Sequence, residues 1–267
     1  MENFKLFLIG ENLSTNTVAA YVTAVKGYMC AYEDFNKKSL LAWKANLIDN
    51  YKAKTVNLKI QALNKYLEFI KKPNLKIKAV KVQQRTFLEN VISDADYIFL
   101  KRKLKQEPNK EWYFIVRFLC ATGARVSELI KIKVEHVNAG YIDLYTKGGK
   151  IRRIYIPLAL KKETLIWIRD VLNIETGYIF LNRFGERITT RGISQQLKNY
   201  AIKFGIDPKV VYPHSFRHRF AKNFLEKYND IALLADLMGH ESIETTRIYL
   251  RKTASEQQAI VDKIVTW

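Results

Sequence analysis

The chain has 267 residues, 48% of them hydrophobic and 12% aromatic, which excludes a disordered polypeptide and predicts one or two globular domains. Its 45 Lys and Arg residues against 26 Asp and Glu give a formal net charge of +19, which favours a nucleic-acid partner over a basic surface that binds nothing. No apolar stretch reaches the ~20 residues that span a bilayer, and the N-terminus lacks the features of a secretory signal, so we expect a cytoplasmic protein without a membrane partner.

The first 80 residues are predicted to form a small all-helical domain. Between residues 14 and 70 the apolar side chains recur at helical spacing, and we expect about four short helices there, the first long one capped by Ser14. Residues 71–86 contain a proline and six basic residues but no acidic one. We interpret them as a linker, which either lies along a phosphate backbone or is an ordinary solvated connector.

Residues 87–267 are predicted to form a second domain, mainly α with a small antiparallel β-sheet. Ser93 and the acidic residues after it predict a helix to about Lys105. Alternating apolar residues around the turn Lys147-Gly148-Gly149-Lys150 predict a β-hairpin with two lysines at its tip. The other expected elements are helices near 110–120, 126–131, 158–172 and from 190 onward, and a possible short strand at 178–181.

The two cysteines, Cys30 and Cys120, stand far apart in apolar stretches, without a CxxC pair or a histidine at zinc-ligand spacing beside them. We therefore expect two buried free thiols in a reducing compartment and no metal site at either of them.

Reactive side chains gather in three segments of the second domain. His214 and Arg217 lie three residues apart on one predicted helix, so that both could address one phosphate, although such a pair alone is more typical of a protein surface. Arg125 follows a glycine turn at the start of a helix, behind an apolar segment that could hold it inward. His240 and Tyr249 stand on either side of a predicted helix cap at Ser242, and Tyr249 alone, as one of 15 tyrosines, would be interpreted as an ordinary packed aromatic.

The segments ATGARVSEL, HSFRHRFA and LMGHESIETTRIY resemble the motifs of the tyrosine recombinases, also called the phage integrase family. The resemblance covers nearly the whole chain, with Phe216 at a position where that family more often has leucine. It implies a helical, SAM-like core-binding domain in residues 1–80, a catalytic domain in residues 87–267, and a two-domain C-shaped clamp around double-stranded DNA. A homo-tetramer on two DNA sites is also implied. The residues that follow the family's catalytic order are Arg125, Lys147, His214, Arg217, His240 and Tyr249.

The implied chemistry is site-specific DNA recombination. Tyr249 would attack the phosphorus and release a 5′-hydroxyl, storing the bond energy in a 3′-phosphotyrosine so that rejoining needs no cofactor. Arg125 and Arg217 would clamp the non-bridging oxygens, and no metal ion or small-molecule substrate is expected.

The remaining roles are also taken from the resemblance. Lys147 would protonate the leaving 5′-oxygen, His214 would handle the tyrosine proton or bond the phosphate, and His240 would donate a hydrogen bond to it. Lys150 competes with Lys147, but the family's lysine precedes the turn glycine. Glu128 resembles an acidic residue that supports Arg125.

Several alternatives stay open. The chain could be an inactive DNA-binding regulator with this fold or a type IB topoisomerase. Among recombinases we prefer DNA inversion or resolution over an integrase of a mobile element, because no additional arm-type DNA-binding domain precedes the core-binding one. Residues 250–267 form an amphipathic tail that would pack on a neighbouring protomer or fold back on its own domain.

Overall fold

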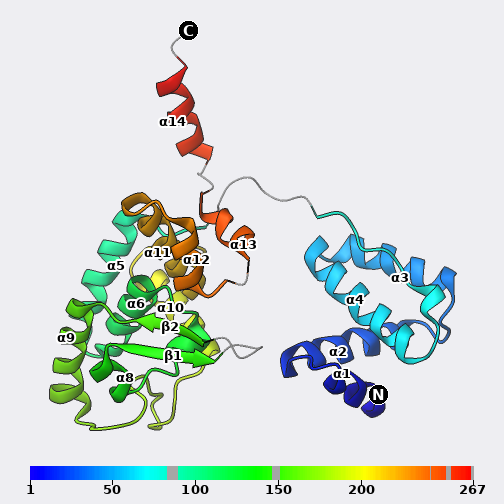
Figure 1. Ribbon diagram of the computed structural model, residues 1–267, viewed down its shortest axis with the longest axis horizontal. Coiled ribbons are helices and arrows are strands. Elements are labelled where there is room, and N and C mark those ends of the chain that lie inside the picture. Colours follow the sequence, from blue (N-terminus) through cyan, green and yellow to red (C-terminus); the bar gives the residue numbers. More distant parts are fainter. Residues whose placement is uncertain (83–89, 146–150, 241, 251–253, 266–267) are drawn as a thin grey trace. The chain divides into compact units, whose positions relative to one another are not determined.

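The computed structural model describes residues 1–82, 90–145, 151–240, 242–250 and 254–265. The chain divides into two compact units, Met1–Gln84 and Arg85–Trp267 (Figure 1). In the described part of the chain, no helix is both long and apolar enough to cross a membrane.

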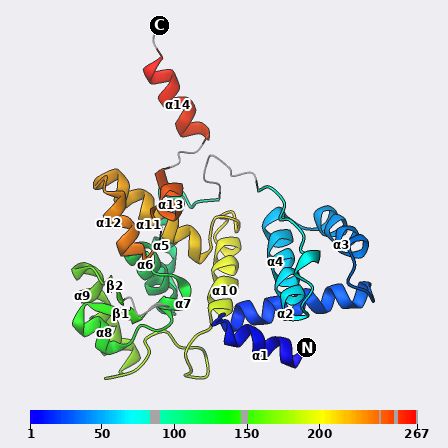
Figure 2. The same ribbon diagram turned by 45° about the vertical axis from the view of Figure 1, so that its right-hand side comes forward.

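The first unit consists of helices whose apolar faces pack into two hydrophobic clusters, one that includes Phe4 and Leu8 and another that includes Leu40 and Trp43. In Figures 1 and 2, α2 (Thr15–Ala31) and α4 (Ala53–Phe69) pack side by side, and Ser14 caps α2 by accepting a hydrogen bond from the Thr17 amide at 3.3 Å. The helices are α1 (Glu2–Gly10), α2 (Thr15–Ala31), α3 (Lys37–Asn50) and α4 (Ala53–Phe69). Residues 14–70 thus hold three helices rather than the four expected, because α2 and α4 run for 17 residues each without a break.

The chain after α4 continues to pack on this unit. Following the short 3₁₀ turn Pro73–Leu75, the Ile77 side chain is buried, and its backbone makes two hydrogen bonds with the Asn64 side-chain amide, of 3.0 and 2.9 Å. The Asn57 side-chain amide likewise makes two hydrogen bonds with the backbone of Val80, of 2.8 and 2.9 Å. The interpretation of 71–86 as a linker was therefore wrong for its first half, which belongs to the first unit up to at least Val80.

The second unit is mainly helical with one two-stranded antiparallel sheet, as expected. Its elements are α5 (Asp94–Gln106), α6 (Glu111–Thr122), α7 (Val126–Leu129), α8 (Val134–Ala139), β1 (Tyr141–Tyr145), β2 (Ile151–Tyr155), α9 (Leu158–Trp167) with a π-helical end Ile168–Leu172, α10 (Thr190–Lys203), α11 (Pro213–Lys227), α12 (Ile231–Met238), α13 (Ile243–Arg247), the 3₁₀ turn Ile248–Leu250 and α14 (Ala254–Ile264). Helix α6 is buried on most of its circumference and packs against α11, so it forms the centre of the core.

The hairpin brings β2 against α12. Tyr141 pairs with Tyr155 and Tyr145 with Ile151, and the hairpin lies between α12 and α8 (Figure 1). The turn at 147–150 lies outside the described residues. Residues 178–181 form isolated bridges at Tyr178 and Leu181 instead of the possible strand, because their backbone groups bond singly to loop segments and to a side chain rather than to a neighbouring strand.

The cysteine prediction was half wrong. Cys30 is exposed, because α2 turns the face with Val25 and Tyr28 toward the core and Cys30 falls off that face. Cys120 is partly buried, and this burial raises the pKa of its thiol to about 11.

Candidate active site

The loop after α6 holds Arg125 beside the core. Gly123 ends α6 with a φ of +62°, and a Cβ there would lie 2.4 Å from the Phe220 ring, so the position needs glycine. Arg125 then begins α7, where its backbone N–H donates to Glu128 Oε2 at 2.7 Å and its Nη1 donates to Glu128 Oε1 at 2.9 Å. Glu128 thus supports Arg125 as expected, and the Arg125 side chain, 39% exposed, keeps access to solvent.

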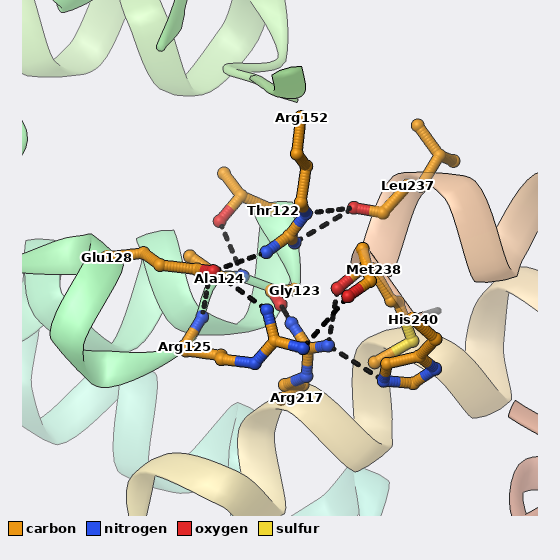
Figure 3. A network of polar contacts seen from close by, with 11 residues as sticks. Thr122, Gly123, Ala124, Arg125, Glu128, Arg152, Arg217, Leu237, Met238 and His240 are labelled. Carbon is orange, nitrogen blue, oxygen red and sulfur yellow. Dashed lines mark hydrogen bonds and ion pairs between the residues drawn. The ribbon is translucent and has the colours of Figure 1, made fainter. Parts of the chain in front are cut away.

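Arg217 is the largest fully buried side chain of the protein as described, with 1% of its surface exposed. Its Nη1 donates to the Gly123 carbonyl and its Nη2 to the Met238 carbonyl at 2.7 Å (Figure 3). Burial, assisted by the nearby charge of Arg125, lowers its pKa to about 10, so the guanidinium stays charged at neutral pH. Its Nε has no acceptor among the described residues, which leaves one buried donor for a ligand.

The turn after α12 brings His240 to Arg217. Gly239 ends α12 with a φ of +60°, and His240 Nε2 then lies 3.0 Å from Arg217 Nη2. Because a guanidinium can only donate, Nε2 accepts, and the imidazole proton lies on Nδ1, which donates to Thr246 Oγ1 at 2.7 Å. Burial lowers the pKa of His240 to about 4, and the charges of Arg217 and Arg125 contribute to this shift. His240 is therefore neutral, and in this state its two nitrogens are occupied by protein partners rather than offering a donor to a phosphate.

Tyr249 lies beside this cluster in the 3₁₀ turn that follows α13. The residue is 5% exposed and packs with apolar residues of α11 and α12. Its ring is nearly parallel to that of His240, with centroids 6.1 Å apart, and meets the His218 ring edge-on at 5.1 Å. Burial raises the pKa of the Tyr249 phenol, while the charge of Arg217 and a hydrogen bond with it act in the opposite direction.

His214 lies at the exposed start of α11, one turn before the buried Arg217. Its ring is 4.8 Å from that of His218, and burial together with the charge of Arg217 lowers its pKa. The same stretch of surface is hollowed into a pocket lined by Arg125, His214, Lys198 and Lys209, among others. This basic pocket has the charge that a phosphate group requires.

The structure thus brings together Arg125, His214, Arg217, His240 and Tyr249, whereas Lys147 and its competitor Lys150 lie outside the described residues. Among the described residues, no three His, Cys, Asp or Glu side chains are grouped so that they could hold a metal ion.

Two members of the site were missed from the sequence. Arg152 reaches the cluster from β2, and His218 lies between His214 and Tyr249. A signal existed for both: Arg152 has the inward parity of Ile154 on its strand, and His218 follows His214 by four residues on one helix.

The comparisons with known proteins agree on one family. The sequence profile of the phage integrase family matches residues 99–256. The tyrosine recombinase XerA of Pyrococcus furiosus is 29% identical over 98% of this chain and 93% of its own, and that of Thermococcus kodakarensis is 30% identical over 99% and 97%. Among solved structures, the Tn1549 transposon integrase in complex with circular intermediate DNA shares the fold at 16% identity, with a TM-score of 0.73 over 98% of this chain and 99% of that chain.

Proposed function

Because this chain belongs to the phage integrase family of tyrosine recombinases, which are enzymes of site-specific recombination, we propose that it cuts and rejoins double-stranded DNA with Tyr249 as the nucleophile. The observation that carries the proposal is the convergence of Arg125, Arg217 and His240 beside the buried Tyr249 ring. The transposon integrase of similar fold was solved with DNA, and the net charge of +19 suits the same partner.

The two arginines would stabilise the phosphate as its charge grows. Arg125 is partly exposed and borders the basic pocket, and Arg217 Nε is buried without an acceptor in the described part of the chain. In phosphoryl transfer, negative charge spreads over the non-bridging oxygens, and donors fixed in a buried site stabilise it more than mobile ones in water. The covalent step forms a bond between Tyr249 Oη and phosphorus and breaks the bond between phosphorus and the 5′-oxygen.

Two protons must move in that step. Burial keeps the Tyr249 phenol protonated at neutral pH, so its proton has to pass to a base as the hydroxyl attacks. We assign this task to His214, whose alternative role is to form a hydrogen bond with the phosphate. We assign the protonation of the leaving 5′-oxygen to Lys147. His240 would either hydrogen-bond the phosphate, once its contact with Arg217 rearranges, or keep Arg217 in place.

We further propose that the reaction inverts or resolves DNA within a homo-tetramer bound to two sites. The XerA relatives are matched over 93% and 97% of their own lengths, so this chain has nearly the extent of those recombinases. Val261 and Ile264 of helix α14 and the following Val265 are exposed apolar side chains suited to a neighbouring protomer. A plasmid with two copies of the site in direct or inverted order separates resolution from inversion, and integration of a mobile element is the alternative outcome.

Covalent trapping tests the central step. Purified protein is mixed with nicked duplexes cut from the DNA that flanks its own gene, denatured in SDS and examined for a protein–DNA adduct. We expect an adduct with the natural protein and with Tyr228→Phe, a matched control at an exposed tyrosine, and none with Tyr249→Phe. Relaxation of supercoiled DNA without a second site would identify a topoisomerase instead. Sequence-specific binding without an adduct, on fragments that cover the bound site, would identify an inactive regulator.

A further inference from the structure

We propose that Arg152 is a positioning residue of this active site: a buried tie between β2, Glu128 and the end of α12 that fixes Arg125 and the turn at His240 without touching DNA. The proposal rests on the function proposed above. It concerns a residue outside the set that the sequence motifs indicated, and it begins from an unusual burial. Arg152 is only 5% exposed although it lies in a two-stranded hairpin.

The Arg152 guanidinium donates hydrogen bonds to acceptors of the protein itself. Its Nη1 donates to Glu128 Oε1 at 2.5 Å, and its Nε and Nη2 both donate to the Leu237 carbonyl, at 3.1 and 2.9 Å (Figure 3). Arg125 differs, because its side chain is 39% exposed and borders the basic pocket. The geometry therefore leaves Arg125 accessible to the substrate, whereas Arg152 is buried and bonds to protein groups.

Glu128 transmits the position of Arg152 to Arg125. One carboxylate oxygen, Oε1, accepts from both guanidinium groups, and the other accepts from the Arg125 backbone. Without Arg152, the carboxylate would lose the donor that holds it on the side opposite Arg125. Glu128 and Arg125 could then move together toward solvent, and the Arg125 guanidinium would no longer be held in one orientation toward the phosphate.

The end of α12 is the second point that Arg152 holds. Leu237, Met238 and Gly239 are consecutive, and their carbonyls accept from Arg152, Arg217 and Arg125, respectively. A Cβ on Gly239 would lie 2.1 Å from Arg152 Cδ, so the stem of Arg152 packs directly on this turn. Three guanidinium groups thus satisfy the last carbonyls of one helix, where positive charge is favoured by the helix dipole.

The test uses Arg152→Met, which keeps an unbranched stem but removes the charge and the donors, and Arg152→Lys, which keeps the charge on a single ammonium. The matched control is Arg153→Met on the same strand, because Arg153 points outward and pairs with Asp143 at 2.7 Å. Each protein is measured for the single-turnover rate of adduct formation on the nicked duplex, for the Kd of the intact duplex and for melting temperature.

We expect Arg152→Met to lower the rate of adduct formation by roughly tenfold to a hundredfold, with little change in the Kd for DNA. Arg152→Lys should recover part of the rate, because its ammonium can reach either Glu128 or the Leu237 carbonyl but cannot reproduce the planar fork. Arg153→Met should keep the natural rate. A natural rate in Arg152→Met would overturn the proposal.

A readout without DNA separates this proposal from the proposed function. In protein with ¹³C-labelled histidine, the His240 resonance is titrated by NMR and identified by its loss in His240→Gln. The groups that face His240 are Arg217, Arg125, Arg152, His214 and Tyr249, together with Thr246. Removing the Arg152 charge should raise the pKa of His240, whereas Arg152→Lys should leave it nearly unchanged.

The two readouts fail independently. If the natural protein forms no adduct, the function fails, while a raised His240 pKa in Arg152→Met together with a lowered melting temperature, neither of them seen in Arg153→Met, still supports the tie. If Arg152→Met does not fold, Arg152→Lys decides. A natural rate of adduct formation in Arg152→Lys would show that the guanidinium fork is dispensable. If no protein forms an adduct, a melting temperature of Arg152→Lys equal to that of the natural protein would show the same.

Discussion

The contribution of one buried carboxyl group, Glu111, to the stability of the second unit should fall as the pH rises from 4.5 to 7, whereas the lowered pKa of His240 acts in the opposite direction. Glu111, in the first turn of α6, is only 9% exposed, and its Oε1 accepts a hydrogen bond from the Leu181 amide at 2.8 Å. Burial raises its pKa from an ordinary 4.5 to about 7 in the folded protein, against the opposing effect of that hydrogen bond.

The sign follows from which state holds the proton. Below pH 4.5 Glu111 is protonated in both states; between 4.5 and about 7 the unfolded chain ionises while the folded protein still holds its proton. The unfolded state is therefore favoured progressively, and the effect levels off above pH 7. At ~1.4 kcal/mol per pH unit, the interval from 4.5 to about 7 corresponds to about 3 kcal/mol of unfolding free energy.

Glu111→Gln removes the ionisation and keeps an oxygen that can accept from Leu181. Urea unfolding followed by circular dichroism, at half-unit steps from pH 4.5 to 8.5, gives the stability of both proteins. The difference in unfolding free energy between the two proteins should change by about 3 kcal/mol in favour of the variant as the pH rises. Any destabilisation by the amide itself does not depend on pH and leaves this change unaffected. Glu175→Gln, at an exposed glutamate, is the control. Parallel pH profiles for the natural protein and Glu111→Gln would refute the reasoning.

Three further predictions concern the turn at Gly239, the segment that follows α4 and the net positive charge. Gly239→Ala forces a side chain into a φ of +60° against Arg152 and should lower the melting temperature, at a cost of about 1–3 kcal/mol in strain, whereas Gly27→Ala, in open space on α2, should raise stability by up to about 1 kcal/mol. Asn64→Ala leaves the buried Ile77 backbone unpaired and should cost about 1–3 kcal/mol in urea unfolding, compared with almost nothing for the exposed Asn50→Ala. Affinity for duplex DNA, measured by fluorescence anisotropy, should fall on the order of 10³-fold between 50 and 200 mM salt, and an unchanged Kd would contradict charge-driven binding.

The local features of this fold could be predicted because they depend on neighbours in the sequence. The caps at Ser14 and Ser93 accept the expected amide hydrogen bonds, and the glycine turns at 123 and 239 adopt the left-handed conformation. The hairpin follows from its alternating pattern, with Tyr141 opposite Tyr155. In each case the signal spans only a few residues, so no knowledge of the tertiary structure was needed.

The features that could not be predicted depend on residues far apart in the chain. Asn57 and Asn64 appear in the sequence as polar residues on a helix, yet each pairs with a segment beyond the end of that helix. His240 was expected to donate to the phosphate; that role stays a prediction, and its hydrogen bond with Arg217 could not be foreseen from the sequence. The role of Lys147 stays a prediction, because it lies outside the described residues.

The arrangement of charge suggests why a site with so many arginines can exist before any DNA binds. Arg125, Arg152 and Arg217 surround a single carboxylate, and the mutual repulsion of their charges, together with burial, would destabilise the fold if nothing else compensated for it. Backbone carbonyls supply the compensation: each arginine donates to one at the end of α12, and these oxygens carry the negative end of the helix dipole. Since carbonyls are neutral, they hold the guanidinium groups in place without cancelling their charge. A phosphate that enters would therefore meet a cluster that is already oriented and still positive, and the cost of ordering these side chains has been met during folding rather than in the reaction.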